Sequence, residues 1–133
     1  IDITLRAEGD DIHHLIEDVG IVMGQGLREA IGSEPIARMH SATVAMDDAL
    51  VMTTVDLVDR PYVDIECTDQ LYHHFLRSFA MAAGMTLHVM VMRGFDDHHI
   101  VEGAFKSLGI CLRNALVVRD DELSTKGSVK RGV

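Results

Sequence analysis

Asp96-Asp97-His98-His99-Ile100-Val101-Glu102 repeats an earlier stretch, Asp11-Ile12-His13-His14-Leu15-Ile16-Glu17, at a constant offset of 85 residues. Nine positions are identical at this offset, namely Gly9/Gly94, Asp11/Asp96, His13/His98, His14/His99, Glu17/Glu102, Gly24/Gly109, Leu27/Leu112, Arg28/Arg113 and Ala30/Ala115. One matching motif would mean little, whereas nine identities in register indicate an internal duplication.

Each copy is predicted to begin a helix, in which about 3.6 residues per turn fix the direction of every side chain. In the first copy His13 and Glu17 are four residues apart and share a face, so they can bind one metal ion. His14 lies about 100° further round the helix and must reach a second partner. The second copy repeats this arrangement. Imidazole mixed with carboxylate suits manganese, iron or zinc better than calcium or magnesium. One such motif could equally be a polar helix start, but capping needs no second histidine.

Composition places the chain among soluble globular proteins. With 133 residues and 47% hydrophobic content, it is expected to form one domain with a substantial core. No apolar run of about 18 residues occurs, so no membrane span is predicted. The formal charge of -9 disfavours a nucleic-acid partner and suits a protein that attracts cations. Cys67 and Cys111 form no CxxC pattern, which is typical of small buried side chains in a reducing cytoplasm.

Alternating patterns predict several strands. Strict alternation over residues 1–8 predicts a half-buried strand, and we therefore expect an N-terminal portion of the protein to precede this sequence. From residue 42 to residue 67 the pattern predicts two or three antiparallel strands, with turns at 46–48 and 58–61. A mostly apolar strand at 86–92 leads into the second copy of the motif.

Helical spacing and end signals predict three helices. The first carries the first copy of the motif, and Gly32 is expected to end it. A middle helix has a broad apolar stripe, with Thr68 or Asp69 as its N-cap and Gly84 as its end. The third helix carries the second copy. The order strand, helix, strand, helix predicts a mixed α/β domain.

The two motif regions, residues 13–21 and 97–106, resemble the two signatures of imidazoleglycerol-phosphate dehydratase, an enzyme family of histidine biosynthesis. Further matches to that family are Met46-Asp47, Arg60-Pro61-Tyr62, His74-Phe75, Gly84-Met85-Thr86-Leu87-His88 and Ser124-Thr125-Lys126-Gly127. The resemblance covers nearly the whole chain. It departs from the family at His73 and Asp48, where many relatives carry glutamate.

The resemblance implies an α/β fold (an α+β two-layer arrangement) made of two pseudo-repeats of a ribosomal protein S5 domain 2-like unit, the first truncated. Residues 1–33 would be the C-terminal part of the first repeat, 34–117 the second repeat, and 118–133 a C-terminal tail. The family forms large cubic assemblies of trimers, so a 24-mer with active sites shared between subunits is expected.

The resemblance also implies two manganese ions (Mn²⁺) per site, with other divalent transition metals as substitutes. One ion would take His13, Glu17, His74 and His99. The other would take His14, His98, Glu102 and a histidine that is expected before residue 1. The family's catalytic base, a glutamate, is likewise expected before residue 1, so no catalytic residue is assigned within this sequence.

The phosphate group of the substrate would be bound by residues that match the family's arginines and C-terminal tail. Alone, an arginine is more often a surface ion-pair residue, but a guanidinium fork suits phosphate oxygens. Lys106 could reach the same pocket or simply pair with Glu102 along the helix. The substrate-binding candidates are Arg38, Arg60, Lys106, Ser124, Thr125 and Lys126.

The implied function is a metal-dependent, cytoplasmic dehydratase that converts imidazole glycerol phosphate to imidazole acetol phosphate. Two other readings stay open. A dinuclear metallohydrolase would also use a His/Glu cluster to activate water, and turnover of simple phosphate esters would distinguish it. A non-catalytic, metal-bridged assembly protein, or a truncated relative without its base, would bind metal without dehydrating anything.

Overall fold

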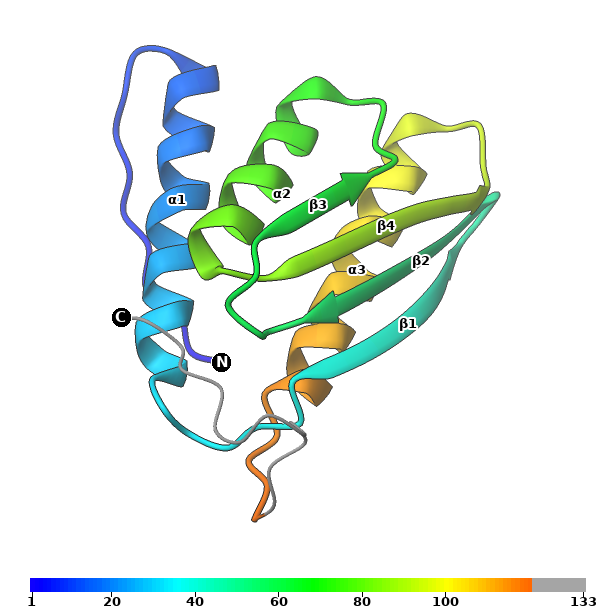
Figure 1. Ribbon diagram of the computed structural model, residues 1–133. Helices are drawn as coiled ribbons and strands as arrows, with labels where there is room; N and C mark the ends of the chain where they lie inside the picture. The colour runs from blue at the N-terminus through cyan, green and yellow to red at the C-terminus, as the bar shows by residue number, and fades with distance from the viewer. Residues whose placement is uncertain (121–133) are drawn as a thin grey trace.

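Three helices and one four-stranded sheet make up the computed structural model, which describes residues 1–120 (Figure 1). The elements in chain order are α1 (Ile12–Ile31), β1 (Met39–Met46), β2 (Ala49–Asp56), β3 (Tyr62–Ile65), α2 (Gln70–Ala83), β4 (Thr86–Arg93) and α3 (Asp97–Ala115). The predicted α/β class is thus confirmed. Within residues 1–120, no helix combines the length and apolar character that crossing a membrane requires.

The strands are hydrogen-bonded in the order β1-β2-β4-β3. β1 pairs antiparallel with β2 across a turn at Asp47 and Asp48, as expected, and β2 pairs antiparallel with β4. The expectation of two or three antiparallel strands up to residue 67 is confirmed for the pair β1 and β2, whereas β3 pairs in parallel with β4 at the sheet edge. The cause is the connection, because a helix between two strands, here α2, brings the chain back in the same direction.

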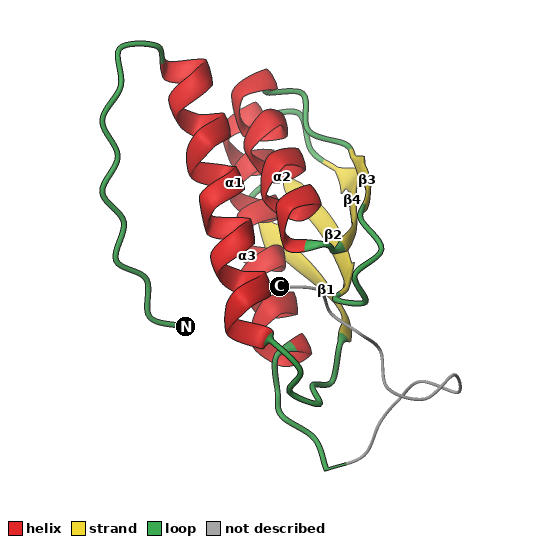
Figure 2. Cartoon of the chain, turned by 60° about the vertical axis from the view of Figure 1, so that its left-hand side comes forward, coloured by secondary structure: helices red, strands yellow, loops and turns green. Residues whose placement is uncertain are grey.

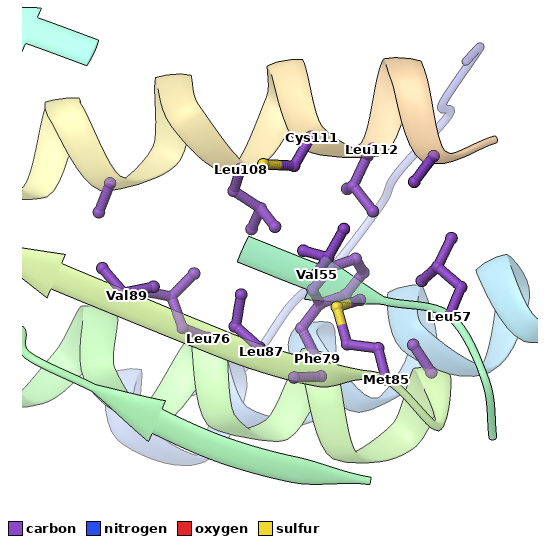
Figure 3. Packing of buried hydrophobic residues seen from close by; sticks show 14 of the residues in the cluster. Val55, Leu57, Leu76, Phe79, Met85, Leu87, Val89, Leu108, Cys111 and Leu112 are labelled. Carbon is purple, nitrogen blue, oxygen red and sulfur yellow. The ribbon is translucent and has the colours of Figure 1, made fainter. Parts of the chain in front are cut away.

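Every helix lies on one side of the sheet, and no helix or strand of residues 1–120 covers the opposite face (Figure 2). Alternate residues of β2 are buried, as a sheet with one covered face requires. The core lies between the helix-covered face of the sheet and the apolar stripes of α2 and α3 (Figure 3). Its labelled members are Val55, Leu57, Leu76, Phe79, Met85, Leu87, Val89, Leu108, Cys111 and Leu112.

The predicted strand at residues 1–8 is not formed. These residues run alongside α1 without secondary structure, and the side chains of Ile1, Ile3 and Leu5 are exposed (Figure 2). A strand needs a neighbour for its backbone N–H and C=O groups, and β1 to β4 lie on the far side of the helices from this segment. Polar and apolar residues do alternate here, but no segment within residues 1–120 forms strand pairing with residues 1–8.

α1 packs directly on α2 through glycines. A Cβ atom at Gly24 would lie 2.4 Å from the carbonyl oxygen of Phe79 and 2.8 Å from Cβ of Ala82. At Gly20 a Cβ atom would lie 3.0 Å from the carbonyl oxygen of Phe75. The backbones of the two helices therefore approach more closely than any larger residue at position 24 would allow.

The two cysteines are buried, as predicted. Burial raises the pKa of the Cys111 thiol to about 11, so the group stays protonated and its Sγ donates to the carbonyl oxygen of Thr53 over 3.2 Å. Nearby, the hydroxyl groups of Thr53 and Ser107 are hydrogen-bonded to each other at 2.6 Å. These buried polar side chains between β2 and α3 are hydrogen-bonded, and their role is structural.

Candidate metal centre

Both copies of the motif begin helices, and they do so with the same cap. The side chain of Asp11 accepts hydrogen bonds from the backbone N–H groups of His13 and His14, and Asp96 does the same for His98 and His99. The N-terminal ends of α1, α2 and α3 all lie at one end of the domain, which Figure 1 shows at the top. All seven predicted metal ligands belong to these three ends.

On α3 the predicted pairing of histidine with glutamate is present. Nε2 of His98 lies 3.5 Å from Oε2 of Glu102. Lys106 holds the other oxygen, with Nζ 2.8 Å from Oε1, and this contact lowers the pKa of the Glu102 carboxyl. Lys106 thus forms the helical ion pair considered above. The His98 side chain is 82% exposed, so it is available to a ligand from outside the chain.

His99 turns to a different partner, as the helical geometry predicted. Its Nδ1 lies 2.5 Å from Oδ1 of Asp48, and its Nε2 lies 3.3 Å from Oδ2 of Asp47. The contact with Asp48 raises the pKa of the His99 ring. The N–H of Phe95, then the ring of His99 and the N–H of Asp96, hold the pKa of the Asp48 carboxyl well below its usual range.

Sequence reasoning missed the part played by this turn. Asp47 and Asp48 connect β1 to β2, and Asp47 has a positive φ of 49°, which aspartate tolerates better than most residues. The available signal was an acidic pair in a hairpin turn before the second motif. No sequence pattern near the turn indicated that Asp48 would contact His99, 51 positions later.

The predicted ligands on α1 and α2 are more exposed to solvent than His99 and Glu102 on α3. His13, His14, Glu17 and His74 are exposed, and Nδ1 of His14 lies 3.8 Å from the capping Asp11. The rings of His73 and His74 are 6.3 Å apart, centre to centre. The expected pairing of His13 with Glu17 stays a prediction.

One pair of the predicted ligands fits a metal ion in type and spacing. Imidazole nitrogens and carboxylate oxygens bind such ions at about 2.0–2.2 Å, so neighbouring ligands on one ion lie about 3.0–3.5 Å apart. The 3.5 Å between His98 and Glu102 agrees with this spacing. Among residues 1–120, however, no three His, Cys, Asp or Glu side chains converge as a metal site would require. The four-ligand sets stay predictions.

The predicted phosphate-binding arginines lie at the opposite end of the domain. Arg38 precedes β1, where its Nε lies 2.9 Å from Oδ1 of Asp56. Arg60 is exposed in the connection from β2 to β3. β1 has eight residues and so separates this end from Asp47 by about 25 Å. Ser124, Thr125 and Lys126 lie outside the described residues.

Comparison with known proteins gives one consistent match. Residues 1–112 match the family profile of imidazoleglycerol-phosphate dehydratase. A protein of that name from Clostridium botulinum is 40% identical over 147 aligned positions, which cover 97% of this chain and 74% of the relative. Another, from Nitratidesulfovibrio vulgaris, is 43% identical and covers 96% of this chain and 74% of its own length.

Solved structures agree with these matches. The enzyme from Pyrococcus furiosus, crystallised in complex with (S)-C348, superimposes with a TM-score of 0.84 at 38% identity, over 90% of this chain and 73% of that one. The Staphylococcus aureus enzyme gives a TM-score of 0.80 at 32% identity, over 84% and 72% of the two chains.

Proposed function

Because the chain belongs to the imidazoleglycerol-phosphate dehydratase family, hydro-lyases of histidine biosynthesis, we propose that it dehydrates imidazole glycerol phosphate with two divalent metal ions per site. The observation that carries the metal proposal is the pair formed by His98 and Glu102, whose facing atoms are 3.5 Å apart. The same His-to-Glu spacing recurs on α1. A capping role leaves this pairing unexplained, since Asp96 already caps α3.

The reaction explains why metal ions are needed. No carbonyl group acidifies the carbon that loses its proton, so the imidazole ring of the substrate has to take up negative charge. Divalent ions, if held by the predicted ligands, would supply that stabilisation as Lewis acids. The histidines and glutamates at the starts of α1, α2 and α3 would hold these ions. Arg38 and Arg60 bind the phosphate, which fixes the glycerol arm and converts remote binding energy into positioning.

The positions of these residues support a site shared between copies of the chain. The metal ligands and the arginines lie at opposite ends of one domain, about 25 Å apart along β1. A small phosphorylated substrate cannot span that distance. A second copy that brings its arginine end to the metal-ligand end of the first resolves the conflict, and it accounts for the self-association into a large homo-oligomer that we propose.

Coexpression of two inactive variants tests this arrangement in the natural protein. His98→Asn removes a ligand at one end, and Arg60→Ala removes an exposed phosphate contact at the other. In a mixed assembly some sites combine the intact end of each variant, so dehydratase activity should return. A chain that carries both substitutions serves as the control and should stay inactive. A mixture as inactive as either variant alone would mean that each site is built within one chain.

Removal of metal is expected to weaken assembly as well as activity. If the four-ligand sets are completed by other copies, each ion links subunits, and a chelator should shift the size-exclusion profile to smaller species. Mn²⁺ added back should restore both the large species and turnover. A profile that the chelator leaves unchanged would count against metal-linked assembly, without bearing on the reaction itself.

A further inference from the structure

Asp48 links the turn between β1 and β2 to the start of α3. Its Oδ2 accepts the backbone N–H of Phe95 at 2.8 Å and that of Asp96 at 3.1 Å. Its Oδ1 lies 2.5 Å from Nδ1 of His99. Three donors thus converge on one carboxylate from the segment that immediately precedes and begins α3.

The two histidines of α3 differ in how firmly they are held. The His99 side chain is 25% exposed and Asp48 is 18% exposed, whereas His98 is 82% exposed. In the α1 copy the equivalent residue, His14, is also mostly exposed, with its nearest carboxylate 3.8 Å away. Only His99, among these, has a ring nitrogen hydrogen-bonded to a half-buried carboxylate.

We propose that Asp48 is a positioning residue that holds His99 as its Nδ1–H tautomer and so presents Nε2 as the metal-binding atom. The carboxylate can only accept hydrogen bonds, and its second oxygen is already occupied by two amide groups. Nδ1 must therefore carry the hydrogen. An ion held at Nε2 would displace any proton there to solvent, and Nδ1–H would stay hydrogen-bonded to Asp48. A metal-binding histidine commonly donates its other ring N–H in this way, and the partner fixes the ring.

This inference rests on the proposed function, because it assigns a role toward a metal ion. It also makes a claim of its own. The ions differ in their ligands, so loss of Asp48 should affect the ion that takes His99 and spare the ion that takes His98. A residue that served only to hold the turn in place would not discriminate between them.

Asp48→Asn separates the two possibilities. The side-chain oxygen of asparagine can still accept the N–H groups of Phe95 and Asp96, but its NH₂ then faces Nδ1 and can only donate. The ring is driven to the opposite tautomer, with the hydrogen on Nε2. Glu29→Gln is the matched control, because it removes one exposed carboxylate from the last turn of α1, at the other end of the domain.

The experiment is a titration of the metal-free natural protein with Mn²⁺, followed by the electron paramagnetic resonance signal of the free ion, at a temperature where circular dichroism shows each variant folded. We expect wild type and Glu29→Gln to bind two classes of ion, and Asp48→Asn to bind one class about 10- to 100-fold more weakly and the other unchanged. Equal affinities in Asp48→Asn and wild type, or equal weakening of both classes, would overturn the positioning role. A wild-type protein that binds no Mn²⁺ would instead overturn the proposed function.

Discussion

His98→Asn is expected to abolish dehydration and leave the fold intact. The imidazole is 82% exposed and contacts Glu102 within its own helix, so its loss removes little packing. Asparagine has no ring nitrogen to replace the ligand, and loss of more than about 100-fold in turnover is expected, beyond what changes outside the ligand set cause. Turnover, metal content and the far-ultraviolet circular dichroism spectrum of the natural protein measure catalysis, metal binding and the fold, respectively.

His40→Asn is the control for this prediction. His40 lies on β1, away from the metal-ligand end, and has no assigned part in the site. The same chemical change there should leave turnover and metal content near the wild-type values. A His98→Asn protein that kept its activity together with its full metal content would show that His98 is not a ligand.

Gly24→Ala is expected to lower the free energy of unfolding by about 3 kcal/mol, at the upper end of the usual cost of overpacking. The added Cβ would meet backbone atoms of α2, at 2.4 Å from the carbonyl oxygen of Phe79 and 2.9 Å from the nitrogen of Ala83. Backbone cannot turn aside as the end of a long side chain can, so α1 has to shift. Urea unfolding with the slope compared between variants measures the change.

Gly26→Ala is the matched control on the same helix. A Cβ atom there meets nothing within 4 Å, and alanine is the better helix former by about 0.5–1 kcal/mol. This variant should be slightly more stable than wild type, so the two substitutions should differ in sign. Equal stability of the two variants would contradict the close packing of α1 on α2.

Local signals made most of the elements predictable. The helices were visible because apolar spacing agreed with their caps, and Gly84 ends α2 in the left-handed conformation that favours glycine. Asp69 proved to be the cap of α2, one of the two candidates given. The duplicated motif predicted that His98 and His99 point to different partners, since that follows from helix geometry alone.

Contacts between distant residues were not predictable. The turn at Asp48 meets His99 only because β1, β2 and α3 pack together, and no sequence spacing encodes that meeting. The alternation in residues 1–8 resembles a strand but cannot say whether a partner strand lies beside it. The direction of β3 depends on the helix that follows rather than on its own four residues.

The complete ligand set of the proposed metal site was not predictable from the single chain for a similar reason. Ligand types and spacing follow from the two motifs, whereas convergence of a full ligand set does not occur within residues 1–120. The separation of Arg38 from the histidines points the same way. Each half of the proposed chemistry is visible in the sequence, and in the shared site that we propose the relation between the halves depends on how copies meet.

Metal analysis coupled to a dehydratase assay tests the central claim, that duplicated helix starts present imidazole and carboxylate to a pair of ions. The natural protein should contain about two divalent ions per chain, lose turnover of imidazole glycerol phosphate when a chelator removes them, and regain it with Mn²⁺. Full turnover by protein free of metal would contradict the claim.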